Sequence, residues 1–266
     1  MYELNEKDYY KINTLVLKLK NEIIWVSSIL NNQQKCAKIF VDNLNIPKTA
    51  IIWHKCRNAI IIGDFNEEIF DNLKLLLNNE YTKNQQQFAL YVLDKNWEQC
   101  IDQYILQNNL IKKYNRKYFR FNNEKYYIFK DSVKEQINKI NFKTVDLKNY
   151  KELNFKYMPD RYWDSIEDFI KNGINYCVYY DKQYVSIAFS GFLDNNKCDI
   201  GIETLVEFQG KGFASLAATK LIDYCLSNNI EPIWGCRSDN ISSSKISNKL
   251  GFECIGKSAY YIKEDI

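Results

Sequence analysis

The sequence has no apolar run of about 18 residues, the length a helix needs to cross a bilayer. No segment near its start combines basic residues, an apolar stretch of signal length and a small-residue cleavage site. The eight cysteines are scattered singly without a C-x-x-C pair, which is typical of buried apolar side chains in a reducing compartment. We therefore expect a cytoplasmic protein without a membrane partner.

The sequence also has few histidines and a small net charge. The single histidine, His54, excludes a metal site built from several histidines, and its apolar, strand-like surroundings favour a structural imidazole. A net charge of +3 is too small to indicate a nucleic-acid partner. One basic cluster, residues 112–120 with aromatic residues interleaved, is compatible with phosphate binding and base stacking. The same alternation is typical of a half-buried strand with a solvated face. We favour that reading, and expect neither a metal nor a nucleic acid.

Glycine is rare and unevenly distributed. Of nine glycines, only Gly63 precedes residue 173. The length of 266 residues and the hydrophobic content of 46% suit two compact units better than one. The polar run 130–143 contains no turn glycine or proline and can join them. We expect a mixed α/β protein with a break near residue 138, which separates an N-terminal α/β domain, 1–138, from a C-terminal domain, 139–266.

The N-terminal half carries both helical and strand patterns. Apolar residues recur at helical spacing over 8–30, and a second helix is expected at 34–43. Two β-rich runs with a short polar connection, 49–55 and 58–64, predict a hairpin. The remaining expected elements are helices at 67–78 and 97–107 on either side of a strand at 88–94, and an aromatic hairpin built from 117–121 and 125–129.

The C-terminal half has a clearer order of elements. A helix at 165–173 ends at a glycine and is followed by three strands. A glycine turn then opens a helix with one apolar face, and a strand, a second helix and a final pair of strand segments follow. In chain order, the expected strands are 174–181, 184–193, 198–206, 231–236 and the segments within 251–262, with the last helix at 242–249.

Two of the nine glycines, Gly210 and Gly212, lie between the third of these strands and the following helix, in the stretch ETLVEFQGKGFASLAATKLIDYCL. Successive amides from Gly210 to Ser215 at a helix start present unpaired donors and the positive end of the helix dipole, which together bind a diphosphate. The glycines keep side chains away, and Lys211 adds charge at the rim. The alternative is that both glycines only make a tight turn. The spacings of a dinucleotide fingerprint and of a P-loop do not occur.

The segment QGKGFA, Gln209 to Ala214, resembles the Q/R-x-x-G-x-G/A signature of the GNAT superfamily of acyl-CoA-dependent N-acetyltransferases. The segment Asn240 to Phe252 is similar to that superfamily's second motif, an asparagine followed after about ten residues by Leu-Gly-Phe. The resemblance covers roughly residues 140–262. It implies a GNAT-like mixed sheet flanked by helices, which binds acetyl-CoA and transfers its acetyl group to a primary amine by direct attack. The N-terminal half lacks the glycine motif, and our hypothesis for it is a degenerate copy of the same fold.

The resemblance also implies the residues that bind acetyl-CoA. The pantetheine arm lies between two splayed parallel strands, 198–206 and 231–236, and an amide near Thr204 faces the thioester oxygen. Asn240 reaches the pantetheine amides, or caps the following helix, and the two roles are compatible. The full set of expected cofactor-binding residues is Thr204, Gln209, Gly210, Lys211, Gly212, Phe213, Ala214, Ser215 and Asn240.

Attack requires an uncharged amine, so a base must take a proton from the acceptor. Many superfamily members use a carboxylate on the fourth strand, where Asp199 and Glu203 point to one side of this chain. Either is a candidate base, with exposure to solvent or pairing with a cation as the alternative; we prefer Glu203 because it adjoins Thr204. The superfamily often has a tyrosine where this chain has Ser247, and that tyrosine protonates the departing thiolate. In this chain the candidate proton donors are Ser247, water, Tyr260 and Tyr261.

These features predict an N-acetyltransferase whose acceptor, a small molecule or a peptide amine, cannot be read from the motifs. The replacement of the tyrosine by Ser247 leaves a second hypothesis open, an inactive protein that binds or senses acyl-CoA. The expected oligomeric state is a monomer or a homodimer.

Overall fold

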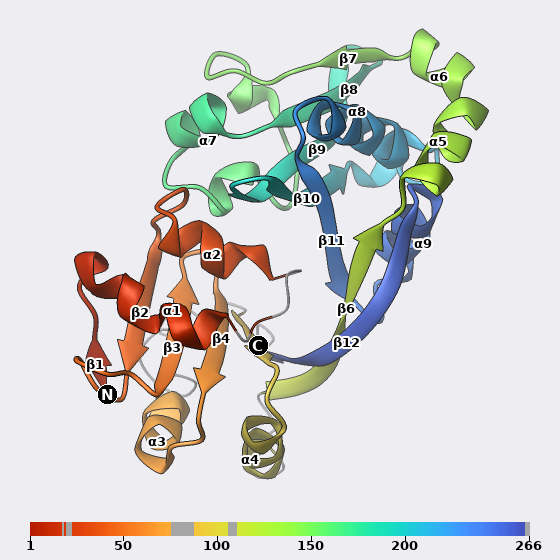
Figure 1. Ribbon diagram of the computed structural model, residues 1–266. Helices are drawn as coiled ribbons and strands as arrows, with labels where there is room; N and C mark the ends of the chain where they lie inside the picture. Colours follow the sequence, from red (N-terminus) through yellow and green to blue (C-terminus); the bar gives the residue numbers. More distant parts are fainter. Residues whose placement is uncertain (18, 20–22, 76–87, 106–110, 264–266) are drawn as a thin grey trace.

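The computed structural model describes residues 1–17, 19, 23–75, 88–105 and 111–263. Within these residues the strands form one mixed sheet in the order β1-β2-β3-β4-β5-β12-β6-β11-β10-β9-β8-β7. Helices pack against this sheet, as Figure 1 shows, so the predicted α/β class is confirmed. The strands are β1 (Tyr2–Glu3), β2 (Ala37–Val41), β3 (Thr49–His54), β4 (Asn58–Gly63), β5 (Phe88–Val92), β6 (Ile111–Phe121), β7 (Asn141–Lys143), β8 (Asn175–Tyr180), β9 (Gln183–Asp194), β10 (Lys197–Thr204), β11 (Glu231–Arg237) and β12 (Phe252–Lys263).

The two halves repeat one arrangement. In the first, β4 and β5 are parallel neighbours, and the chain between them includes α3 (Glu67–Leu75). In the second, β10 and β11 are parallel neighbours joined through α8 (Phe213–Ser227). Antiparallel strands precede both pairs, and each is followed by a helix and a long strand. The other helices are α1 (Asn13–Val16), α2 (Ile24–Leu30), α4 (Lys95–Ile105), α5 (Asn123–Ser132), α6 (Lys134–Lys139), α7 (Ile166–Asn172) and α9 (Ile241–Lys249).

The last strand of each half is exchanged with the other half. β6 lies between β11 and β12, whereas β12 lies between β5 and β6 (Figure 1). β6 pairs with β11 from Trp234↔Phe119 to Arg237↔Arg116, and β12 pairs with β5 from Ala259↔Val92 to Lys263↔Phe88. The sheet is therefore continuous across the two halves, and residues that precede position 138 complete the sheet of the C-terminal half.

Alternation along the strands separates the buried residues into cores on the two faces of the sheet. Around the N-terminal strands, to which β12 is added, Ile52 and Tyr260 belong to the core beneath α1 and α2, whereas Ile51 and Tyr261 belong to the core beside α3 and α4. In the C-terminal half, the apolar side of α8 packs on the face that contains Ile200 and Trp234. The opposite face of that half is covered by α7 and the irregular segment before it.

Several predicted elements agree with the structure, and three do not. The hairpin β3–β4, the strand β5 and the C-terminal elements from α7 to α9 are confirmed, and the predicted final pair of strand segments is one strand, β12, with a register shift between Cys254 and Gly256. The predicted helix at 34–43 is wrong, since this segment contains β2, and the predicted helix at 8–30 is broken into a 3-10 turn and two short helices. The predicted strand at 125–129 is helical in α5, which is capped by the Asn122 side chain. The described helices α3 and α4 end at 75 and 105, so the predicted residues 76–78 and 106–107 lie outside the described residues.

Candidate active site

The glycine turn has the conformation that the sequence indicates. Gly210 has φ +76° and Gly212 has φ +85°, and a Cβ atom built on either would meet no atom within 4 Å. Packing therefore does not require glycine at either position, but the left-handed backbone conformation favours it. The space above both residues is open. Gly212 is the N-cap of α8 and has no side-chain cap. The amides of residues 210–215 donate no hydrogen bond to the described residues, so they are available to an anion.

Hydrogen bonds connect this turn to the end of β10. The Gln209 side-chain amide donates to the Thr204 carbonyl at 3.3 Å. The Ser186 hydroxyl lies 2.7 Å from the Thr204 hydroxyl and donates to the Glu203 carbonyl at 3.0 Å. The Lys211 ammonium lies 4.7 Å from the centre of the Phe208 ring, at the exposed rim. These hydrogen bonds fix the position of Thr204 relative to the amides of the turn.

β10 and β11 separate beyond their first residues. They pair only from Lys197↔Glu231 to Asp199↔Ile233, after which β10 continues along β9 and β11 continues along β6. At the same point the register of β9 shifts by one residue, because Gly191 has no partner between Ser190 and Phe192. This bulge and the divergence of the two strands open the sheet at Asp199.

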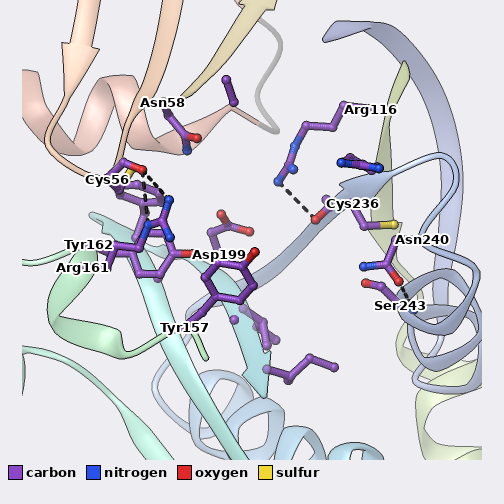
Figure 2. A pocket seen from close by; sticks show the side chains of 18 of the residues that line it. Cys56, Asn58, Arg116, Tyr157, Arg161, Tyr162, Asp199, Cys236, Asn240 and Ser243 are labelled. Carbon is purple, nitrogen blue, oxygen red and sulfur yellow. Dashed lines mark hydrogen bonds between the residues drawn. The ribbon is translucent and has the colours of Figure 1, made fainter. Parts of the chain in front are cut away.

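A cavity of about 320 Å³ occupies this opening. At one end it is lined by Asn240 and Ser243 from the start of α9, and at the other by Cys56 and Asn58 from the β3–β4 turn (Figure 2). Asp199 and Glu203 line the wall formed by β10. The N-terminal half therefore contributes to the cavity, although it has no glycine turn of its own. The volume is that of a site for a small molecule.

Both carboxyl groups of β10 have raised pKa values. Burial raises the pKa of Asp199 to about 6, and the charge of Arg116 partly offsets this rise. Burial raises the pKa of Glu203 to about 7, and the charge of Lys156 partly offsets it. Neither side chain accepts a hydrogen bond from the described residues, and neither lies within 4.0 Å of a described cation. A carboxylate with a pKa near 7 suits a general base at neutral pH.

The structure separates the remaining predicted residues. Asn240 caps α9 by accepting from the Ser243 amide at 3.0 Å, and it also lines the cavity. Ser247 is fully buried, donates to the Ser244 carbonyl at 3.0 Å and is not part of the lining, so its predicted catalytic role is not supported by its position. Tyr260 lines the cavity, whereas Tyr261 lies on the other face and donates to Asp102 at 2.7 Å.

Arg116 is a charged lining residue that the sequence reasoning missed. It belongs to the basic cluster 112–120, which was expected to be a solvated face, but its guanidinium is directed into the cavity (Figure 2). It donates to the Gly235 carbonyl at 3.1 Å and lies over the rings of Tyr91 and Tyr260. The alternation of β6 is visible in the sequence, but β11, the strand beside Arg116, is distant from β6 in the chain.

Two further residues lie beside the cavity. Gly201 lies between the two carboxylates on β10, and a Cβ atom there would lie 2.5 Å from the Phe189 ring, so the ring fills this space. His54 has the expected structural role. It is fully buried, accepts from the Cys56 amide at 3.1 Å and contacts the Cys36 sulfur, and burial lowers its pKa to about 3.

Comparison with known proteins decides the family. A profile of the GNAT acetyltransferase family matches residues 13–261, which is nearly the whole chain. The chain belongs to the GNAT acetyltransferase family. This GNAT chain is 27% identical over 265 residues to the uncharacterized N-acetyltransferase YdfB of Bacillus subtilis (strain 168), and the match covers 98% of each protein. A second relative from that organism, the uncharacterized N-acetyltransferase YjdG, is 37% identical over 84 residues, which are 29% of this chain and 50% of YjdG.

Solved structures support the fold over the full length. A GCN5-related N-acetyltransferase-like protein from Streptococcus suis 89/1591 superposes with a TM-score of 0.74 at 19% identity, covering 96% of this chain and 98% of that one. A tandem GNAT protein from the clavulanic acid biosynthesis pathway superposes with a TM-score of 0.62 at 7% identity, covering 100% and 98%. The second match agrees with the repeated arrangement of the two halves. Among the described helices, none is long and apolar enough to cross a membrane.

Proposed function

We propose that this GNAT protein transfers an acetyl group from acetyl-CoA to the primary amine of an acceptor held in the cavity. The observation that carries the proposal is the glycine turn at the start of α8, which is joined through Gln209 and Thr204 to the opening between β10 and β11. In this proposal the turn holds the diphosphate, the opening between the strands takes the pantetheine arm, and the cavity holds the acceptor beside a base.

The donor is assigned to the side of α8 and α9. The free amides of residues 210–215 hold the diphosphate, and Lys211 adds a positive charge at the exposed rim. Asn240 uses its side-chain oxygen to cap α9, which leaves its amide group to donate to a pantetheine carbonyl. The backbone near Thr204 faces the thioester, where an amide donor stabilises the tetrahedral oxyanion.

Glu203 is proposed as the general base. Its pKa of about 7 is raised by burial, so the group is largely ionised just above neutral pH and still basic enough to take a proton from an ammonium. Asp199 shares the cavity but lies about 13 Å further back along the extended strand. Loss of the acceptor proton precedes attack on the thioester carbon, and collapse of the tetrahedral intermediate releases the CoA thiolate.

No hydroxyl from α9 is assigned to protonate that thiolate, since Ser247 is buried away from the cavity. A thiolate with a pKa near 8.5 is a tolerable leaving group, and either water or the cavity-lining Tyr260 can supply the proton afterwards. The same position of Ser247 is the specific observation that favours the second candidate, a protein that binds acyl-CoA without turnover.

A screen separates the two candidates. Full-length protein is incubated with acetyl-CoA and a panel of polyamines, aminoglycosides, amino acids and peptides, and thiol release is followed. Transfer predicts release that depends on one acceptor class and is abolished in Glu203→Gln, while calorimetry shows unchanged acetyl-CoA affinity. Saturable acetyl-CoA binding without release on any acceptor supports the second candidate, and absence of binding overturns both.

A further inference from the structure

Arg116 carries a half-buried positive charge that no described carboxylate neutralises. Within the described residues its one hydrogen bond is to a backbone carbonyl, that of Gly235. The guanidinium lies against Gly235, since a Cβ atom there would be 3.1 Å from Nη2, and its Cζ atom lies 5.4 Å and 5.7 Å from the ring centres of Tyr91 and Tyr260. A guanidinium has five donors, so several remain free to face the cavity.

No described carboxylate pairs with Arg116, because none lies within 4.0 Å of it. Its partner across the strands, Arg237, is also an arginine, and like charges in directly opposite positions are destabilising. Arg237 is neutralised by a bidentate pair with Asp239. Arg116 has no such compensation, so the free protein holds an excess positive charge at this end of the cavity.

A second arginine, Arg161, also lines the cavity, on the side of Cys56 (Figure 2). It donates through Nε and Nη2 to the Cys56 carbonyl, which leaves Nη1 without a hydrogen bond to the described residues. Figure 2 shows the Arg116 and Asp199 side chains entering the same space from opposite sides. The charge of Arg116 lowers the pKa of Asp199, although the two side chains form no ion pair within 4.0 Å, so unlike charges face each other across a gap.

We propose that the acceptor is a small amine that also carries a carboxylate, which Arg116 binds while the amine faces the carboxylates of β10. This inference rests on the proposed transfer reaction and names its substrate class. A zwitterion fills the gap between unlike charges and neutralises both, whereas a polyamine or an aminoglycoside would bring further positive charge to Arg116. The cavity volume of about 320 Å³ suits a free amino acid rather than a folded protein.

Matched pairs of amines that differ only by the carboxylate test the proposal: lysine against cadaverine, ornithine against putrescine, and β-alanine against ethylamine. Binding is measured first, by calorimetry on full-length protein saturated with CoA, so that no turnover is needed. We expect the carboxylated member of at least one pair to bind about 10- to 100-fold more tightly, which is the range for a charge-assisted hydrogen-bonded pair. Turnover of the same pairs with acetyl-CoA should show the same preference in kcat/KM.

Variants then assign the preference to Arg116. Arg116→Met should remove it by weakening the carboxylated amine about 10- to 100-fold and leaving its partner within about threefold. Arg116→Lys keeps a charge but lacks the fork, so it should fall between. The matched control is Arg120→Met on the same strand, because Arg120 is exposed and outside the cavity lining.

The outcomes distinguish this inference from the function on which it rests. Equal binding of both members of every pair, or an equal loss of both in a folded Arg116→Met protein, overturns the inference and leaves acetyl transfer intact. Selective binding of the carboxylated amine without acetyl transfer supports the inference and overturns the transfer reaction. If Arg116→Met does not fold, the preference of the wild type and the result for Arg116→Lys decide.

Discussion

Replacing Gly212 by glutamate separates the role of the glycine turn in binding from its role in folding. Gly212 has φ +85°, so a residue with a side chain must adopt a left-handed backbone there, which costs about 1–2 kcal/mol of stability. It incurs no packing cost, because an added Cβ atom meets nothing within 4 Å. The full-length variant should therefore fold, with a free energy of unfolding lower by roughly that amount.

The affinity for acetyl-CoA should fall by more than this loss of stability. A carboxylate about 5 Å from the diphosphate repels each unit of charge by about 3 kcal/mol at an effective dielectric constant of about 20. One such interaction lowers affinity about 100-fold, and the side chain also occupies space that the ligand needs. Gly212→Asn tolerates the left-handed backbone and adds no charge, so it should lose less affinity than Gly212→Glu.

Calorimetry with acetyl-CoA and thermal unfolding measure the two effects on the same samples. Gly251→Ala is the opposite control, since Gly251 also has φ +85° but a Cβ atom there would lie 2.7 Å from the backbone of Asn122 and Tyr126. It should be destabilised more than Gly212→Glu while its folded fraction binds normally. Wild-type affinity in folded Gly212→Glu would refute the assignment of the diphosphate to this turn.

Five further predictions concern the site and the sheet. Glu203→Gln should lower kcat/KM on a verified acceptor by about 10²- to 10⁴-fold with acetyl-CoA affinity unchanged, and a normal rate would place the base elsewhere. Because the pKa of Glu203 is raised to about 7, wild-type kcat/KM should fall as the pH decreases below about 7 and the carboxyl group becomes protonated; the variant should lack this limb. Ser247→Ala should change kcat less than about threefold, and a loss of 100-fold would return Ser247 to the mechanism. Full-length protein should bind one acetyl-CoA per chain, since the described N-terminal residues lack a second glycine turn, and titration to two equivalent sites would contradict this. A fragment 139–266 should be unstable because it lacks β6, and a fragment as stable as the whole chain would contradict this.

The sequence by itself determined the features whose causes lie within a few residues of each other. The glycine turn, its amides and the start of α8 occupy one short segment, so the residue types alone indicate both the backbone geometry and the anion that suits it. The same holds for α7, whose cap Ser165 and end Gly173 are adjacent to the apolar residues between them. Local determinants of this kind act before any tertiary contact exists.

Tertiary structure decided everything that depends on which strand lies beside which. The alternation in β6 predicts a half-buried strand, but only its insertion between β11 and β12 directs Arg116 into the cavity. Tyr260 and Tyr261 are equivalent candidates in the sequence, and the pairing of β12 assigns one to the cavity and the other to the opposite core. The physical reason is that pairing between distant strands depends on the burial of whole faces of the sheet, and a strand pattern specifies an alternation without specifying its neighbour.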